Sequence, residues 1–167
     1  DDVTDKRYQL EDKKRKIAQE IDNATKDKRI QVAKAEYYEV KKRCLELLNE
    51  HGNDYEHKIF KDIVSQEPAF LASHSPIKIQ EWTDQLQAMT MQILWRIPEF
   101  LVSIFKDLVQ SYRTRFNDQN QAKSLIEAGK FAIQSENWER LGEINHGLIN
   151  LITITKGEGG WKPPIGH

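Results

Sequence analysis

Cysteine is nearly absent from this chain, and long apolar runs are absent altogether. A single cysteine, Cys44, among 167 residues excludes an internal disulfide framework and a thiolate zinc site, and it is typical of a reducing compartment. No segment approaches the roughly 18 consecutive apolar residues that cross a bilayer. The first residues are polar and charged, without the basic and apolar regions of a signal peptide. We therefore expect a soluble protein in the cytoplasm.

An excess of either charge sign is also lacking. Lysine and arginine total 25 against 26 for aspartate and glutamate, which leaves a formal net charge of -1. Such a balance argues against non-specific attraction to nucleic acid or to an anionic membrane. The chain also has no glycine-rich phosphate loop, no His-Glu-x-x-His motif and no nucleophile elbow. These absences favour a protein partner, with no nucleic acid, no membrane, no cofactor in this segment and no enzymatic activity of its own.

Proline and glycine are few, which permits long helices. There are 5 prolines and 8 glycines, and residues 4–50 contain neither. Gly52 follows where a helix C-terminal cap belongs. The spacing predicts one helix over 4–50, which is roughly 70 Å long at 1.5 Å per residue. A compact chain of this size is only about 40 Å across, so part of this helix is expected to project.

Further helices are predicted from apolar spacing and from capping residues. The predicted fold is all-α: a helical bundle with a long protruding N-terminal helix and a C-terminal helical hairpin. Tyr55 is expected on the buried side of the second helix, and Phe116 on that of the fourth. The predicted helices are 53–65 with Asn53 as N-cap, one from Pro76 with Ser75 as N-cap, one that Pro98 starts or kinks, one ending near Gln134, and one capped by Ser135 or Asn137.

Charge and hydropathy divide the chain into three parts. Residues 1–29 form a charged helical arm with 17 charged side chains, 30–156 form the helical bundle body, and 157–167 form a flexible tail. The arm keeps only a thin apolar stripe, which needs a partner. The stripe consists of Leu10, Ile17, Ile21 and Ala24. A stronger stripe that should dock on the body follows, consisting of Ile30, Ala33, Tyr37, Val40, Cys44 and Leu47.

The candidate partner-binding residues are Leu10, Ile17 and Ile21 on the arm, and Trp95. Trp95 lies just before the break at Pro98 and next to Arg96, so it is the tryptophan least committed to a helical apolar face. Trp161 in the predicted tail is the alternative exposed aromatic residue.

One short motif has the spacing of a metal ligand pair. Glu143-x-x-His146 places a carboxylate and an imidazole one helical turn apart, as in carboxylate-bridged metal bundles. At about 100° per residue, however, both fall opposite the apolar face formed by Leu141, Ile144 and Leu148. We therefore expect both side chains in solvent and predict no metal site. The basic run 13–16 points all around the helix axis and is interpreted as part of the solvated arm.

The last third of the chain carries a family resemblance. The residues concerned are Ala122, Leu125, Ile126, Gly129, Ala132 and Ile133, followed by Asn137, Trp138, Leu141, Ile144, Leu148 and Leu151. This pattern resembles the helical hairpin that closes the C-terminal region of divergent bacterial chaperones of the seventy-kilodalton heat-shock (DnaK-type) family. The family's C-terminal lid also begins with a long charged amphipathic helix that leads into a helical bundle.

The resemblance implies a non-catalytic domain that helps to bind client or partner polypeptides. It also implies that ATP is bound by a domain preceding Asp1, and the lack of an initiator methionine agrees with a piece of a longer protein. The acidic Glu-Glu-Val-Asp terminus of the family's eukaryotic cytosolic members is absent. The alternative is a coiled-coil scaffold or adaptor, in which the arm's stripe pairs two chains as a homodimer.

Overall fold

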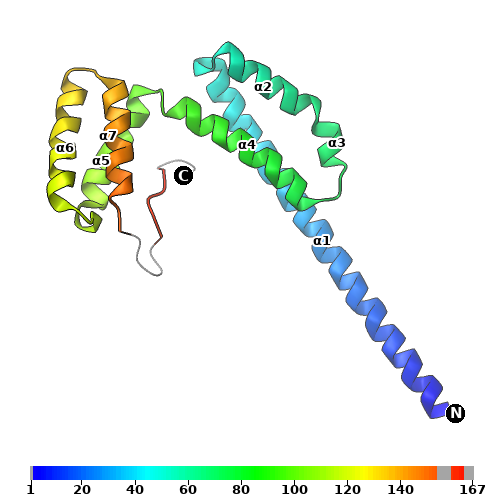
Figure 1. Cartoon of the computed structure of the whole chain (residues 1–167). Helices are drawn as coiled ribbons and strands as arrows, with labels where there is room; N and C mark the ends of the chain where they lie inside the picture. Colours follow the sequence, from blue (N-terminus) through cyan, green and yellow to red (C-terminus); the bar gives the residue numbers. More distant parts are fainter. Residues whose placement is uncertain (1, 154–158, 164–167) are drawn as a thin grey trace. The chain divides into compact units, whose positions relative to one another are not determined.

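The computed structural model describes residues 2–153 and 159–163, and the chain is helical over most of them (Figure 1). Backbone contacts separate two compact units, Asp1–Thr90 and Met91–His167, where the sequence predicted one body over 30–156. The only extended pairing within the described residues is an isolated bridge between Phe116 and Ile152. The all-α fold with a long N-terminal helix is confirmed. The helices are α1 (Asp2–His51), α2 (Asp54–Ser65), α3 (Glu67–Leu71), α4 (Pro76–Leu94), α5 (Pro98–Ser111), α6 (Gln119–Gln134) and α7 (Trp138–Asn150), with a 3₁₀ turn η1 (Arg113–Arg115).

The long first helix is continuous and ends where glycine was expected. The Gly52 backbone N–H donates to the Leu48 carbonyl oxygen at 2.8 Å. A Cβ at residue 52 would lie 2.5 Å from that same oxygen, so a larger residue would push the chain off the helix end. Glycine is needed here for close approach, because its backbone is not in the left-handed region.

The first unit is built on the C-terminal half of α1. Figure 1 shows α2 and α3 carrying the chain back, so that α4 runs beside α1 in the same direction. The Tyr37 and Phe70 rings meet edge-on at 5.1 Å, and Phe70 stacks on Trp82 at 5.2 Å. The buried residues of α1 are Ile30, Ala33, Tyr37, Val40, Cys44 and Leu48.

The structure corrects one residue of this stripe. Leu48 is 1% exposed, whereas Leu47 is only half-buried. At about 100° per residue, Leu48 lies nearer than Leu47 to the mean direction of Tyr37, Val40 and Cys44.

The start of α2 explains a wrong prediction about Tyr55. The Asn53 side chain accepts a hydrogen bond from the Glu56 N–H at 2.8 Å, and the Glu56 carboxylate accepts one from the Asn53 N–H at 3.1 Å. This capping box turns Glu56 inward, in line with Phe60 and Ile63. Tyr55 therefore points outward and is 68% exposed.

The second unit is a small bundle of α5, α6 and α7. Pro98 begins α5 at its first turn, which decides between the two options that the sequence left open. Asp118 caps α6 and Asn137 caps α7 through their side chains. The buried Asn145 amide donates to the Leu101 carbonyl oxygen at 3.0 Å, which ties α7 to α5. The core of this unit comprises Leu101, Ile104, Phe105, Leu108, Phe116, Ala122, Ala132, Leu141, Ile144, Leu148 and Ile152.

Two segments outside the helices depart from the sequence prediction. Phe116 is buried, but it follows η1 instead of belonging to a helix, and it pairs with Ile152 after α7. In the predicted tail, residues 157–158 and 164–167 lie outside the described residues. Of the remainder, the Gly159 carbonyl accepts from the Arg115 guanidinium at 2.7 Å, and the Trp161 indole donates to Asp107 at 3.0 Å. Trp161 is therefore half-buried against the second unit.

None of the helices, searched over the described residues, combines the length and apolar character of a membrane-spanning segment.

Candidate functional site: an exposed helical arm

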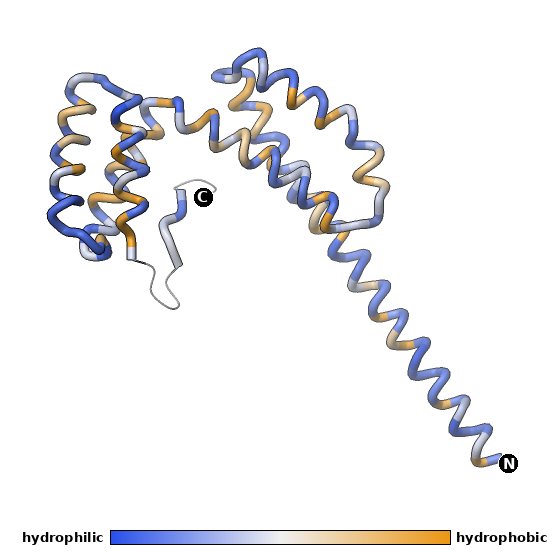
Figure 2. The backbone as a smooth tube through the Cα atoms, in the orientation of Figure 1, coloured by the Kyte–Doolittle hydropathy of each residue, from blue (hydrophilic) through white to orange (hydrophobic). Residues whose placement is uncertain are grey.

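The N-terminal part of α1 is solvent-exposed. Residues 2–29 are all exposed, and Ile30 is the first buried residue. The predicted stripe lies on this arm, with Leu10 54%, Ile17 57% and Ile21 60% exposed. Figure 2 shows isolated apolar patches along an otherwise hydrophilic tube in this part of the chain. The structure thus places the three predicted residues together on one free helix.

The free stripe and the packed stripe lie on opposite faces of α1. Ala24 belongs to the first and Ala33 to the second, and the step of nine residues from one to the other corresponds to two and a half turns. Ile21 and Tyr37 are likewise separated by about 160° around the axis. The arm's stripe is therefore not an overhanging continuation of the face that holds the first unit together. It is a separate contact face.

The arm's apolar residues follow a heptad pattern. Val3, Leu10, Ile17 and Ala24 recur every seven residues, and Val3 is 82% exposed. A second seam position, four residues after each of these, holds Arg7, Lys14, Ile21 and Lys28. One apolar residue per heptad, joined by Ile21 at the second seam position, forms a thin version of the seam through which helices pair.

Charges flank this seam in an ordered way. On one side of the seam, the adjacent positions hold lysine in the first half of the arm, Lys6 and Lys13, and acid in the second half, Glu20 and Asp27. All four of these side chains are exposed. The other side has a single charge, with Thr4, Glu11, Ala18 and Thr25. The Lys6 ammonium lies 3.5 Å from the Asp2 carboxylate, an exposed intrahelical contact that supports the helix only weakly.

A shallow groove lies where the arm joins the first unit. Its volume is about 470 Å³. Two apolar side chains at this groove are exposed, Val32 at 59% on α1 and Ile77 at 74% on α4. Lys28 and Arg29 also line it. The groove therefore extends the exposed apolar surface of the arm with a basic margin.

Trp95 belongs to the second unit, whereas the arm's stripe belongs to the first. It is half-buried, and its ring stacks on that of His146 with centroids 4.0 Å apart and an interplanar angle of 8°. This contact gives Trp95 a structural role at the beginning of the second unit.

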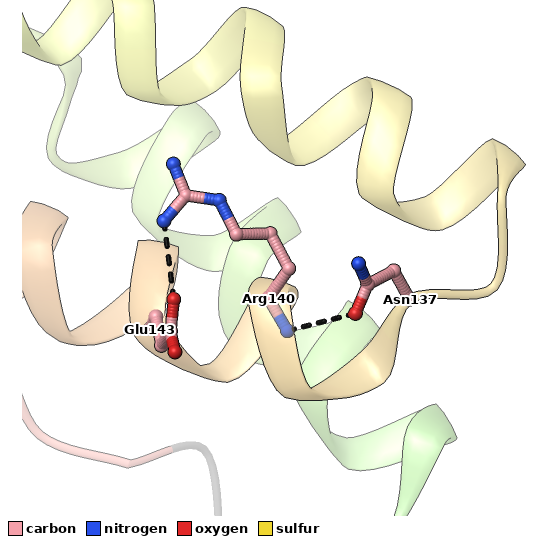
Figure 3. Close-up of polar contacts among 3 residues, drawn as sticks. All are labelled: Asn137, Arg140 and Glu143. Carbon is pink, nitrogen blue, oxygen red and sulfur yellow. Dashed lines mark hydrogen bonds and ion pairs between the residues drawn. The ribbon is translucent and has the colours of Figure 1, made fainter.

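The Glu143-x-x-His146 motif is engaged in other contacts. The Glu143 carboxylate accepts a hydrogen bond from the Arg140 guanidinium at 3.1 Å (Figure 3). The backbone N–H of Arg140 in turn donates to the Asn137 side chain, which caps the helix. The His146 ring is exposed and lies on Trp95. No group of three or more histidine, cysteine, aspartate or glutamate side chains suited to a metal ion occurs among the residues that the structure describes.

The buried titratable groups of the first unit are structural. The Tyr37 hydroxyl donates to Glu67 at 2.6 Å, and Lys41 pairs with the same carboxylate. Burial and this hydrogen bond raise the pKa of Tyr37 above its usual range. Burial likewise raises the pKa of the Cys44 thiol, which opposes thiolate chemistry.

Comparisons with protein-family models, with curated proteins and with solved structures found no match to this chain. The candidate site is therefore supported by the geometry of this chain alone. Their spacing in the sequence predicted Leu10, Ile17 and Ile21 as contact residues, but Val3, which completes the repeat, was missed. The ordered charges beside the seam were missed too, although the same heptad count reveals them.

Proposed function

We propose that this chain is a non-catalytic helical region that acts by contacting other polypeptides, as the C-terminal helical part of a DnaK-type chaperone. The observation that carries the proposal is the arm, whose apolar stripe is exposed, whereas α1 packs its opposite face against the first unit only from Ile30 onward. An apolar helix face exposed to water is a typical protein-binding surface. The order of a long charged helix followed by a small bundle with a closing hairpin supports the chaperone assignment.

A coiled-coil scaffold is the second candidate function, and the heptad repeat of the arm favours it. Both functions use the same stripe. They differ in the occupant, which is an unfolded or unrelated polypeptide for a chaperone and a second helix of defined register for a scaffold.

Polypeptide binding is tested with a permanently unfolded chain such as reduced, carboxymethylated α-lactalbumin, labelled for fluorescence anisotropy. The double variant Ile17→Asp and Ile21→Asp removes the centre of the stripe and should weaken binding about tenfold or more. The matched control Gln19→Asp and Asn23→Asp adds the same charge on the opposite face and should bind as the unaltered protein does. Equal binding by both variants, or none by the unaltered protein, contradicts the proposal.

The chaperone assignment has its own test, which is the native reading frame upstream of the codon for Asp1. An actin-like ATPase pattern followed by a strand-rich segment supports it. A start codon within a few residues rules it out and leaves the scaffold as the better candidate.

A further inference from the structure

We propose that the arm binds the arm of a second copy of this chain in an antiparallel pair centred between Arg15 and Lys16. The inference rests on the second candidate function, the coiled-coil scaffold, because it takes the arm as the contact surface and names a second copy as its occupant. Length, apolar layers and charge each select this register.

The length of the exposed helix gives the centre of the pair. Residues 2–29 are exposed and Ile30 is buried, so the midpoint of the free arm falls between Arg15 and Lys16. An antiparallel pair with this centre places Asp2 of one copy opposite Arg29 of the other. Both arms are then covered from end to end.

The apolar residues meet in this register. Antiparallel helices pack the two seam positions against each other in alternating layers. Leu10 then faces Ile21 of the second copy, and by symmetry this layer occurs twice. Ile17 faces the aliphatic stem of Lys14, whose ammonium group reaches solvent at the edge of the pair.

The flanking charges are complementary in the same register. Lys6 lies beside Asp27 of the second copy, and Lys13 lies beside Glu20. Symmetry doubles both contacts, which gives four intermolecular ion pairs and no like-charge contact at these positions. Each pair is worth little alone at an exposed site, but their sign pattern fixes register and orientation.

The neighbouring arrangements are penalised by charge. A shift of one heptad in either direction brings Lys13 beside Lys13 or Glu20 beside Glu20 of the second copy. A parallel pair instead stacks Arg7 on Arg7 and Lys14 on Lys14 across the seam. Like charges at such positions select against the wrong pairing.

The ends of the arms agree with this arrangement. Asp2 of one copy reaches the level of Arg29 of the other, at the basic margin of the groove. An acidic residue at the start of each helix therefore lies level with the basic end of the partner arm.

A charge-swap experiment on the full chain tests the pairing, with sedimentation velocity as the readout. One variant carries Lys6→Glu and Lys13→Glu, and the other carries Glu20→Lys and Asp27→Lys. The unaltered chain should dimerise at tens of micromolar. Each variant alone turns all four ion pairs into repulsions and should weaken dimerisation about tenfold or more. An equimolar mixture restores four attractive pairs and should form a heterodimer.

The matched control is Arg15→Glu with Lys26→Glu, which changes net charge by the same amount on the face opposite the seam. This variant should dimerise like the unaltered chain. A monomeric unaltered chain overturns the proposal, as does a mixture that stays monomeric or a control that dissociates to the same extent.

Orientation is tested by disulfide formation. Leu10→Cys and Ile21→Cys chains should cross-link to each other when mixed, whereas neither should cross-link to itself. Self-cross-linking of either variant indicates a parallel pair and overturns the proposal. The native Cys44 is fully buried and does not interfere.

Failure of this inference is distinguishable from failure of the proposed function. If the chain is monomeric and the Ile17→Asp and Ile21→Asp variant loses binding of unfolded polypeptide, the arm is a contact surface but its occupant is not a second copy. The proposed function then stands and this inference fails. If the chain is a dimer that binds no unfolded polypeptide, the arm binds a second copy and has no chaperone role. This inference then stands and the chaperone function fails.

Discussion

The thiol of Cys44 lies in the interior of the first unit, 3.7 Å from the Met89 sulfur. Its side chain is 0% exposed, and burial raises its pKa. Because the thiolate is the reactive form, we expect an aromatic disulfide reagent to leave Cys44 unmodified in the native protein and to modify it fully in denaturant. Rapid native modification, measured by absorbance, contradicts this packing.

Tyr37 should make the first unit sensitive to alkali. Burial first, and then the hydrogen bond to Glu67, raise the pKa of its hydroxyl in the folded state. The unfolded chain releases this proton at a pKa of about 10, so the stabilisation is complete below that pH and is lost as the pH rises above it. The Tm of the Tyr37→Phe variant should therefore fall less steeply above about pH 10 than the Tm of the unaltered protein. Thermal unfolding at several pH values, followed by circular dichroism, measures this difference.

The control for this prediction is Tyr55→Phe, because Tyr55 is 68% exposed and lacks a buried hydroxyl. That variant should retain the alkaline dependence of the unaltered protein. If Tyr37→Phe and Tyr55→Phe have the same pH profile, the buried hydroxyl does not contribute.

At the scale of the helix, two glycines in similar positions should respond oppositely to alanine. A Cβ at Gly129 on α6 would overlap the Phe105 ring of α5, whereas a Cβ at Gly142 on α7 would meet the Leu101 side chain only at 4.0 Å. Gly129→Ala should therefore lower the free energy of unfolding by about 1–3 kcal/mol through overpacking. Gly142→Ala should raise it by roughly 0.5–1 kcal/mol through helix propensity. Urea unfolding of both variants measures the contrast.

Helix boundaries were predictable because polar capping residues and prolines mark them locally. Asn53, Ser75, Pro98 and Asn137 each stand at a helix start in the structure, as predicted. The five-residue helix α3 was missed, because a single turn after Gln66 is too short to show apolar periodicity.

The candidate site was only partly predictable for a related reason. The stripe through Leu10, Ile17 and Ile21 is visible in the sequence, since its spacing depends on helix geometry alone. The stacking of Trp95 on His146 joins residues far apart in the chain, and no local pattern predicts it. The inward turn of Glu56, which displaced Tyr55, likewise depends on a side-chain hydrogen bond that competes with the apolar pattern.

At the scale of the whole molecule, the arm should be dispensable for folding and required for association. Residues 2–24 are all exposed, so deleting 1–24 removes no buried side chain of the described residues and leaves Thr25 to cap the shortened helix. We expect Tm to be unchanged, the helical signal to fall by the length removed, and dimerisation to be abolished. Circular dichroism and sedimentation velocity measure these three outcomes.

A matched substitution marks the boundary of the arm. Ile30 is 6% exposed, so Ile30→Asp buries a charge and should destabilise the first unit by several kcal/mol. A large loss of Tm on deleting 1–24 would instead mean that the arm contributes to the core.

The division into two units was not predicted. Apolar periodicity indicates which face of a helix is buried, but it does not indicate which other helices cover that face. The residues of α4 continue at helical spacing through Ile93, across the boundary between Thr90 and Met91. Nothing in that spacing signals a change of unit.

Because α1 is one continuous helix, a pair of arms would fix the distance between the two copies of the first unit. With its centre between Arg15 and Lys16, the two Ile30 residues are separated along the helix axis by about 29 residues, or roughly 44 Å. Two copies of the first unit are thereby held at a fixed spacing by rigid helix instead of flexible linker. A target that presents two binding sites at that interval gains avidity from the pair, whereas one with a different interval does not.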